Sequence, residues 1–275
     1  MLLFDFLEYL TTPCSPEARS MGFLTSSLQT QARHRRCWRA WQPHLLETRR
    51  IILQQTAACP QRRKAVLFGA GLLHDIPLGA LAWQFDEVVL VDVVFLRATR
   101  REAASLKNVR CLEADVTGVM HALFRDPNAP LPRSQPALFL DDPALDFTVS
   151  VNLLSQLPVI PKRWLRREDA EVETWARDLQ AAHLDYLRRL PGRVTLITDT
   201  GGMHRDRTGK IVHAWDNLHG LALPKPDAEW EWKIAPAPEA DRKLDHLARV
   251  AACTSQALPG FSFPSRGIVA DSDAP

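Results

Sequence analysis

The sequence lacks any paired arrangement of cysteines. An odd number of cysteines, none spaced as CxxC, argues against a zinc knuckle, an iron–sulfur cluster or a disulfide framework. We therefore expect no metal centre, and a reducing, cytoplasmic setting fits these thiols best. The five residues are scattered along the chain: Cys14, Cys37, Cys59, Cys111 and Cys253.

Long apolar runs and a large net charge are also absent. No run approaches the roughly 20 residues of a membrane-spanning helix. The first residues, "MLLFDFLEYLTTPCSPEA", carry Asp5 and Glu8 and no basic leader, which predicts an amphipathic helix and not a signal peptide. The net charge of +2 is too small to indicate a nucleic-acid partner from bulk electrostatics. The arginine-rich residues 33–50 keep contact with RNA open as an alternative to a solvated helix face.

From residue 64 onward the sequence alternates between apolar strands and helices. Strands are predicted at residues 65–68, 87–91, 109–112, 147–151 and 193–198, with helices at 76–85, 95–106 and 171–190. This alternation indicates an α/β fold with a doubly wound, mostly parallel sheet. Residues 229–235 and 246–254 predict a terminal antiparallel hairpin. We expect a helical N-terminal cap over residues 1–60, which Pro43 breaks or kinks, a Rossmann-like domain over 61–258 and a loose tail over 259–275.

Polar or glycine residues follow the predicted strands, where ligands of open parallel sheets bind. Gly69 and Gly71 follow the first strand, and glycine lets the backbone approach a ligand closely. Asp92 follows the second strand, about 20 residues beyond Gly71, the distance at which an acid can accept hydrogen bonds from ribose hydroxyls. Asp115 and Asn152 follow the third and fourth strands. This spacing predicts a nucleotide site.

The segments "VLFGAG", "VLVD", "EADV" and "SVNLLSQLP" resemble the successive motifs of class I S-adenosylmethionine-dependent methyltransferases, over roughly residues 64–200. The resemblance implies S-adenosylmethionine as cofactor. It also implies that the first loop cradles the methionine part, that Asp92 binds the ribose, that Asp115 marks the adenine and that Asn152 faces the substrate. The cofactor contacts expected on this basis are Gly69, Ala70, Gly71, His74, Asp75, Asp92, Val93, Asp115, Val116, Asn152 and Gln156.

The first loop departs from the family pattern. The position of the usual acid, two residues before the first glycine, is Leu67, and the third glycine is absent from "GAGLLHD". His74 or Asp75 could supply the polar contact to the amino-acid end, or the site could be degenerate. Plainer interpretations also stand, because Asp75, Asp115 and Asn152 are residue types that cap the helix that follows them.

Two residues are candidates for a catalytic role. Asn152 lies one helical turn from Gln156, so both could face one cleft. His204 lies in a polar segment, residues 201–220, that we interpret as a loop, and it could act there as a general base. The histidines of this segment match no metal-binding helix pattern.

The sequence therefore predicts a methyltransferase that acts on a small-molecule acceptor at oxygen or nitrogen. It contains no "NPPY"-type run of the amino-methylating enzymes of nucleic acid and no cysteine pair of the 5-methylcytosine type. A homodimer is an open expectation. Four other functions stay open: a catalytically inactive binding or assembly module, an NAD-dependent oxidoreductase, an RNA methyltransferase, and an enzyme that uses the sulfonium cofactor for other chemistry.

Overall fold

The N-terminal segment is helical, as expected. The computed structural model describes residues 3–166 and 169–254, so the tail predicted at 259–275 lies outside the described residues. Three helices precede the sheet: α1 (Leu3–Thr11), α2 (Pro16–Met21) and α3 (Phe23–Ala57). Ser15 begins α2, and its side chain accepts a hydrogen bond from the Ala18 N–H. None of the described helices is both long enough and apolar enough to cross a membrane.

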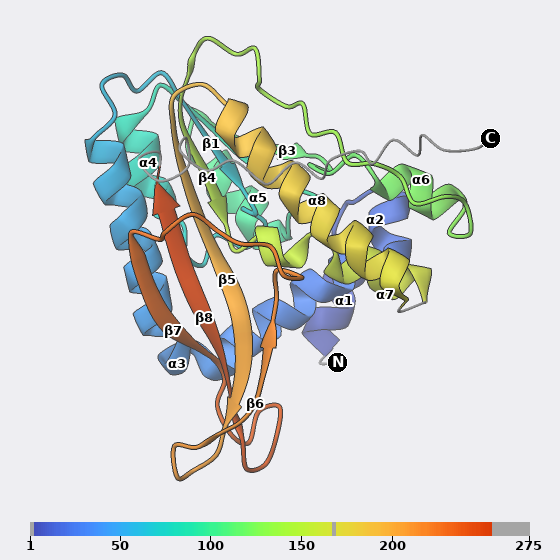
Figure 1. Ribbon diagram of the computed structural model, residues 1–275. Helices are drawn as coiled ribbons and strands as arrows, with labels where there is room; N and C mark the ends of the chain where they lie inside the picture. The colour runs from blue at the N-terminus through green and yellow to red at the C-terminus, as the bar shows by residue number, and fades with distance from the viewer. Residues whose placement is uncertain (1–2, 167–168, 255–275) are drawn as a thin grey trace, which may run out of the picture.

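Helix α3 kinks, although not at its proline. It passes through Pro43 and departs from helical geometry at Cys37 (φ −106°, ψ 16°). A proline cannot donate to the carbonyl four residues earlier, here Arg39, and its ring crowds that carbonyl, so strain falls on the N-terminal side of the proline. The helix therefore kinks as predicted, but at Cys37 and not at Pro43, and the predicted break at Pro43 is wrong. The C-terminal half of α3 packs on the sheet, while the N-terminal half lies beside α1 and α2 (Figure 1).

The described sheet has eight strands, in the order β3-β2-β1-β4-β5-β8-β7, with β6 paired to β5. Strands β1 to β5 pair in parallel, and β8 runs antiparallel to both β5 and β7. The strand order reverses between β1 and β4, which is where doubly wound sheets bind their ligands. The predicted fold class and the terminal hairpin are confirmed. The strands are β1 (Lys64–Phe68), β2 (Glu87–Asp92), β3 (Val109–Glu113), β4 (Leu145–Val151), β5 (Arg193–Arg205), β6 (Ile211–Asp216), β7 (Ala228–Ala235) and β8 (Asp245–Thr254).

Helices cover both faces of the sheet, which explains the continuous apolar strands. From β1, Leu67 packs in one core cluster with Leu81 of α4, while Phe68 packs on the opposite face with Leu187 of α8. Figure 1 shows α8 crossing one face of the sheet and the C-terminal half of α3 lying along the other. The helices after α3 are α4 (Leu78–Gln84), α5 (Arg97–Ala104), α6 (Met120–Arg125), the 3-10 helix η1 (Leu154–Gln156), α7 (Val159–Leu165) and α8 (Ala170–Arg189).

Strand β5 is much longer than predicted. It continues to Arg205 and forms a hairpin with β6, so the interpretation of residues 201–220 as a loop is wrong. Asp206 closes the turn by accepting hydrogen bonds from the N–H groups of Thr208 and Lys210. Two consecutive glycines, Gly201 and Gly202, hid this extension of β5, and the neighbouring β6 is largely exposed and shows no alternating apolar face.

Candidate functional site

Two adjoining cavities lie at the carboxyl ends of the parallel strands. The first, which we call the acidic cavity, has about 200 Å³ and contains Asp92 and Asp115 in its wall. The second, the aromatic cavity, has about 150 Å³ and contains Trp41, His44 and Trp232. Residues of α3 line both cavities, so the N-terminal helix lies over the strand ends. Four residues are common to the two walls: Thr30, Gly69, Asp92 and Asn152.

Most of the residues expected to bind a cofactor meet at these cavities. The acidic cavity is lined by Gly69, Asp92, Val93, Asp115, Val116, Asn152 and Gln156, and the aromatic cavity additionally by Gly71, His74 and Asp75. Ala70 is the exception, because it is fully buried in the core and lines neither cavity. Asp92 and Asp115 therefore line one cavity, although 23 positions separate them in the chain.

Gly69 lies where the two cavities join. Its φ of +81° is in the left-handed region, and a Cβ built there would lie 2.4 Å from the Val151 carbonyl oxygen. Its N–H donates to the Val91 carbonyl at 3.0 Å, which ties the loop to the end of β2. Only glycine fits this position, and its backbone is left bare toward the cavities.

Asp92 holds the first loop in place. Its Oδ2 accepts a hydrogen bond from the Gly71 N–H (2.9 Å) and its Oδ1 one from the Val93 N–H (2.7 Å). Burial raises the pKa of this carboxyl to about 6, although the three neighbouring backbone N–H groups oppose the shift. A carboxylate has about four acceptor positions, so Asp92 keeps acceptor capacity toward the cavities.

Asp115 uses most of its acceptor capacity within its own turn. Oδ1 accepts hydrogen bonds from the N–H (2.9 Å) and the hydroxyl (2.5 Å) of Thr117, and Oδ2 accepts one from the Met120 N–H (2.8 Å). Asp115 thus stabilises the turn before α6 and accepts from the first N–H of that helix, although the N-cap position itself is Val119. Asp115 still lines the acidic cavity, with about one acceptor position left.

Asn152 and Asp75 do not cap helices. Asn152 has a left-handed backbone (φ +47°) and precedes η1 by two residues, while α4 begins after Pro77. The two side chains contact each other instead, with the Asn152 amide 2.7 Å from Asp75 Oδ2. Burial raises the pKa of Asp75. The capping interpretation is wrong for both residues, because each side chain points back toward the junction of the two cavities.

The sequence predicted an N-terminal helical cap, but not that His44 of this cap and Trp230 and Trp232 of β7 meet at the site. His44 is buried, its ring stacks on Trp232 (centroids 4.0 Å apart, planes 7° apart), and its Nδ1 accepts a hydrogen bond from the Trp230 indole at 3.1 Å. Burial lowers the pKa of His44 to about 3. The available signal was a histidine on the apolar stripe of α3, three residues after Trp41 and next to Leu45.

His74 forms the outer wall of the aromatic cavity. Its ring stacks on His34 with centroids 3.8 Å apart, and burial lowers its pKa to about 4. Its Nε2 is buried without a partner among the described residues. The Arg49 guanidinium donates to the His74 carbonyl at 2.5 Å, so this arginine links α3 to the first loop. Arg36 and Arg50 of the same basic stretch pair with Glu239 and Glu47.

His204 is not part of either wall. It lies on the long β5 beside His213 and His246, and the three rings surround Trp215 at 5.0 to 5.3 Å. Nothing in this arrangement brings His204 to the predicted cofactor residues. In the part of the chain that the structure describes, no group of three or more histidine, cysteine or acidic side chains has the geometry of a metal site.

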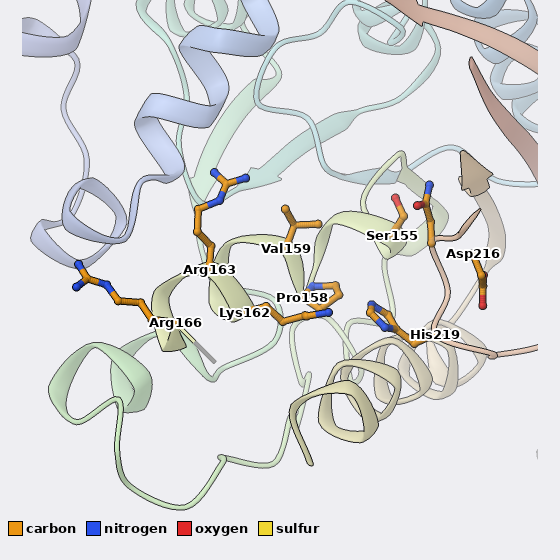
Figure 2. Close-up of a pocket in the computed structure, with 9 residues that line it drawn as sticks. Ser155, Pro158, Val159, Lys162, Arg163, Arg166, Asp216 and His219 are labelled. Atoms are coloured by element: carbon orange, nitrogen blue, oxygen red, sulfur yellow. The ribbon is translucent and has the colours of Figure 1, made fainter. Parts of the chain in front are cut away.

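A separate hollow of about 740 Å³ is shown in Figure 2. It lies along α7 and contains Lys162, Arg163, Arg166 and His219. Glu173 pairs with both Lys162 and His219, which offsets part of the positive charge. Figure 2 shows Arg163 and Arg166 directed away from Ser155. We do not take this hollow as the cofactor site, because none of the residues predicted to bind the cofactor or to act in catalysis lines it.

Comparison with known proteins yields likeness in structure only. No protein-family model and no curated protein sequence matches the chain. The 1,6-didemethyltoxoflavin-N1-methyltransferase of Burkholderia thailandensis aligns over 87% of this chain and 91% of its own, with 14% identity and a TM-score of 0.41. The N-methyltransferase NodS of Bradyrhizobium japonicum aligns over 76% and 86%, with 13% identity and a TM-score of 0.35. The DhpI–SAH complex aligns over 81% and 92%, with 13% identity and a TM-score of 0.34.

Sequence identities and TM-scores this low establish neither the activity of this chain nor its methyl acceptor. The strand order is sufficient to assign the fold. Five parallel strands lie in the order β3-β2-β1-β4-β5, and the sheet continues with the antiparallel β8 and then with β7 at its edge. The chain thus has a Rossmann-like α/β fold of the class I methyltransferase type.

Proposed function

We propose that the protein is an S-adenosylmethionine-dependent methyltransferase that acts on a small molecule. One observation carries the proposal: Asp92, Asp115 and the backbone of Gly69 line a single cavity. An acid after the second strand suits a ribose, and an acid after the third strand suits the adenine that follows it. The adjoining aromatic cavity offers room for the amino-acid end.

The residues present fit this cofactor. Gly69 lines both cavities with its backbone alone, and the buried His74 Nε2 has no partner among the described residues. Taken together, the two cavities reach the lower end of the roughly 300–1,000 Å³ of small-ligand sites. When bound, the cofactor supplies an electrophilic methyl group on sulfur.

The protein's own contribution to such a transfer is to orient the two reactants and to limit the access of water to them. In-line attack needs the two reactants held in contact with the correct orientation. Helix α3 covers part of the strand ends with Phe23, Ser26 and Thr30, which line the acidic cavity and narrow its opening to water. The neutral His44 and the indoles of Trp41 and Trp232 form an uncharged wall beside the space proposed for the amino-acid end.

Calorimetry tests the proposal with S-adenosylmethionine, S-adenosylhomocysteine and NAD. We expect both sulfur nucleosides to bind and NAD not to bind. Asp92→Ala should weaken both about tenfold or more, since a hydrogen bond to a charged acceptor contributes about 1.5–3 kcal/mol. Asp185→Ala, an exposed acid on α8, is the control and should bind as the wild type does.

The same titrations address the rival functions. Binding of NAD alone would replace the proposal with an oxidoreductase. A non-catalytic module is the second candidate, favoured by the way Asp115 is occupied by Thr117 and Met120. No binding of any of the three nucleotides by the folded protein would support that module.

A further inference from the structure

Four polar side chains form a chain of contacts from β7 to the loop before α4. The Trp230 indole donates to His44 Nδ1 at 3.1 Å, and His44 Nε2 lies 3.2 Å from the Asn152 side-chain amide. The same amide atom lies 2.7 Å from Asp75 Oδ2. His44 is 1% exposed, so water does not reach this chain at its centre. Each contact must therefore be satisfied by a proton that one of the four residues provides.

The proton on His44 can be placed by counting donors. An indole N–H can only donate, so Nδ1 of His44 must be the acceptor. Burial keeps the ring uncharged at neutral pH, with its pKa near 3. A neutral imidazole with an accepting Nδ1 carries its one proton on Nε2. That N–H points at the Asn152 amide.

This placement decides which end of the amide faces His44. With the amide nitrogen Nδ2 at the shared position, two donors would meet at 3.2 Å and the His44 proton would have no acceptor. Amide oxygen and nitrogen are told apart by their hydrogen-bond partners. The oxygen Oδ1 therefore belongs at the shared position, and Nδ2 takes the other position, which is buried without a partner among the described residues.

The oxygen then requires a proton from Asp75. Two oxygens 2.7 Å apart form a hydrogen bond only if one carries a hydrogen, and the amide oxygen cannot. Arg49 is the charged group that favours ionisation of Asp75, and burial outweighs it, so the pKa of Asp75 is raised. Of the other titratable groups that line the aromatic cavity, His44 and His74 both have lowered pKa values and are neutral, and burial raises the pKa of Asp92 to about 6.

We propose that His44 is a positioning residue that turns the Asn152 amide so that its nitrogen, a donor, is the end left for the ligand, with Asp75 protonated beside it. This rests on the proposed function for the identity of the ligand. A donor next to an uncharged Asp75 and near Arg49 selects a hydrogen-bond acceptor that carries negative charge. The carboxylate at the amino-acid end of the cofactor is a group of this kind, and an ammonium group is not.

Nuclear magnetic resonance of the ligand-free protein tests the proton placement. At pH 7 the ring nitrogens of His44 should show the Nε2–H tautomer, and the Asp75 side-chain carbon should show a protonated carboxyl. Trp230→Phe should release the tautomer into a mixture. Trp232→Phe is the matched control, since this residue also stacks on His44 but its indole nitrogen has no partner among the described residues. A charged His44, an Nδ1–H tautomer or an ionised Asp75 would overturn the inference.

Binding measurements test the consequence for the ligand. We expect Trp230→Phe to weaken S-adenosylhomocysteine about tenfold, and to change the affinity for 5′-methylthioadenosine, which lacks the amino-acid end, less than about twofold. Equal losses for both ligands would show a merely structural role and defeat the inference. If the wild type binds neither nucleoside, the proposed function fails, while the resonance experiment still decides where the protons are.

Discussion

At the scale of single residues, Asp92 links the geometry of the site to pH. Its carboxylate ties the first loop to β2 and also faces both cavities. Burial raises its pKa to about 6, close to neutral pH. A ligand hydroxyl needs the ionised form as its acceptor, so the protonation of Asp92 should control affinity in an accessible pH range.

We expect the affinity for S-adenosylhomocysteine to fall about tenfold between pH 7 and pH 5. Above pH about 6 the ionised carboxylate accepts the ligand's hydrogen bonds, and below it the proton competes with them. Titration calorimetry across this range measures the effect. Asp92→Asn should bind more weakly and show no such dependence. A flat profile in the wild type would contradict the prediction.

At the scale of secondary-structure elements, α3 provides a wall of both cavities, in addition to the residues that follow the strands. Phe23 to Thr30 cover the acidic cavity, and Trp41, His44 and Leu45 line the aromatic one. Thr30 contacts both cavities from the N-terminal side of the Cys37 kink. The helix therefore acts as a roof over the strand ends, and filling the space beneath it should exclude a ligand.

Thr30→Trp tests this arrangement. The larger side chain projects into both cavities, so we expect loss of S-adenosylhomocysteine binding by about a hundredfold or more, given the strain of overpacking. Gln29→Trp is the matched control, because it adds the same side chain to the neighbouring, exposed position on the same helix. Calorimetry gives the affinities, and thermal unfolding shows whether each variant folds. Equal binding by the two variants would contradict the placement of the site.

The sequence predicted the elements that repeat a simple pattern and missed those that depend on tertiary contacts. The central parallel strands follow from apolar runs, because both of their faces are buried, whereas the edge strand β3 has no buried residue. The extension of β5 and its pairing with β6 do not, since exposed strands tolerate polar residues such as His213. For the site, Asp92 and Asp115 follow from their places after strands. The contact of His44 with Asn152 spans 108 positions and has no local signature.

At the scale of the whole molecule, buried histidines make stability depend on pH. His183 is fully buried between α8 and the sheet, with its Nε2 3.0 Å from the Ser150 hydroxyl. Burial lowers its pKa to about 4, from an ordinary value of 6.5. Between these two values the unfolded chain binds a proton that the folded chain does not. Stability from this source is therefore present above pH 6.5 and is lost as the pH falls toward 4.

Replacing His183 should flatten the acid side of the stability profile. In His183→Leu and His183→Gln, we expect the slope of the unfolding free energy against pH to fall by roughly 1 kcal/mol per pH unit near pH 5. Urea unfolding at several pH values measures this slope. The two variants should agree in slope even if they differ in stability, because only the glutamine can bond to Ser150. An unchanged slope in both would contradict the lowered pKa.

The position of α3 before β1 has a further consequence for what the sequence motifs alone can indicate about the site. All four motifs that suggest a nucleotide site lie at or after Lys64, whereas the roof over that site is built from residues before Ala57. A fragment that started at β1 would retain the complete motif signature and yet leave its chamber open to bulk solvent. The motifs that suggest the nucleotide site and the helix that covers it thus come from different segments of the chain.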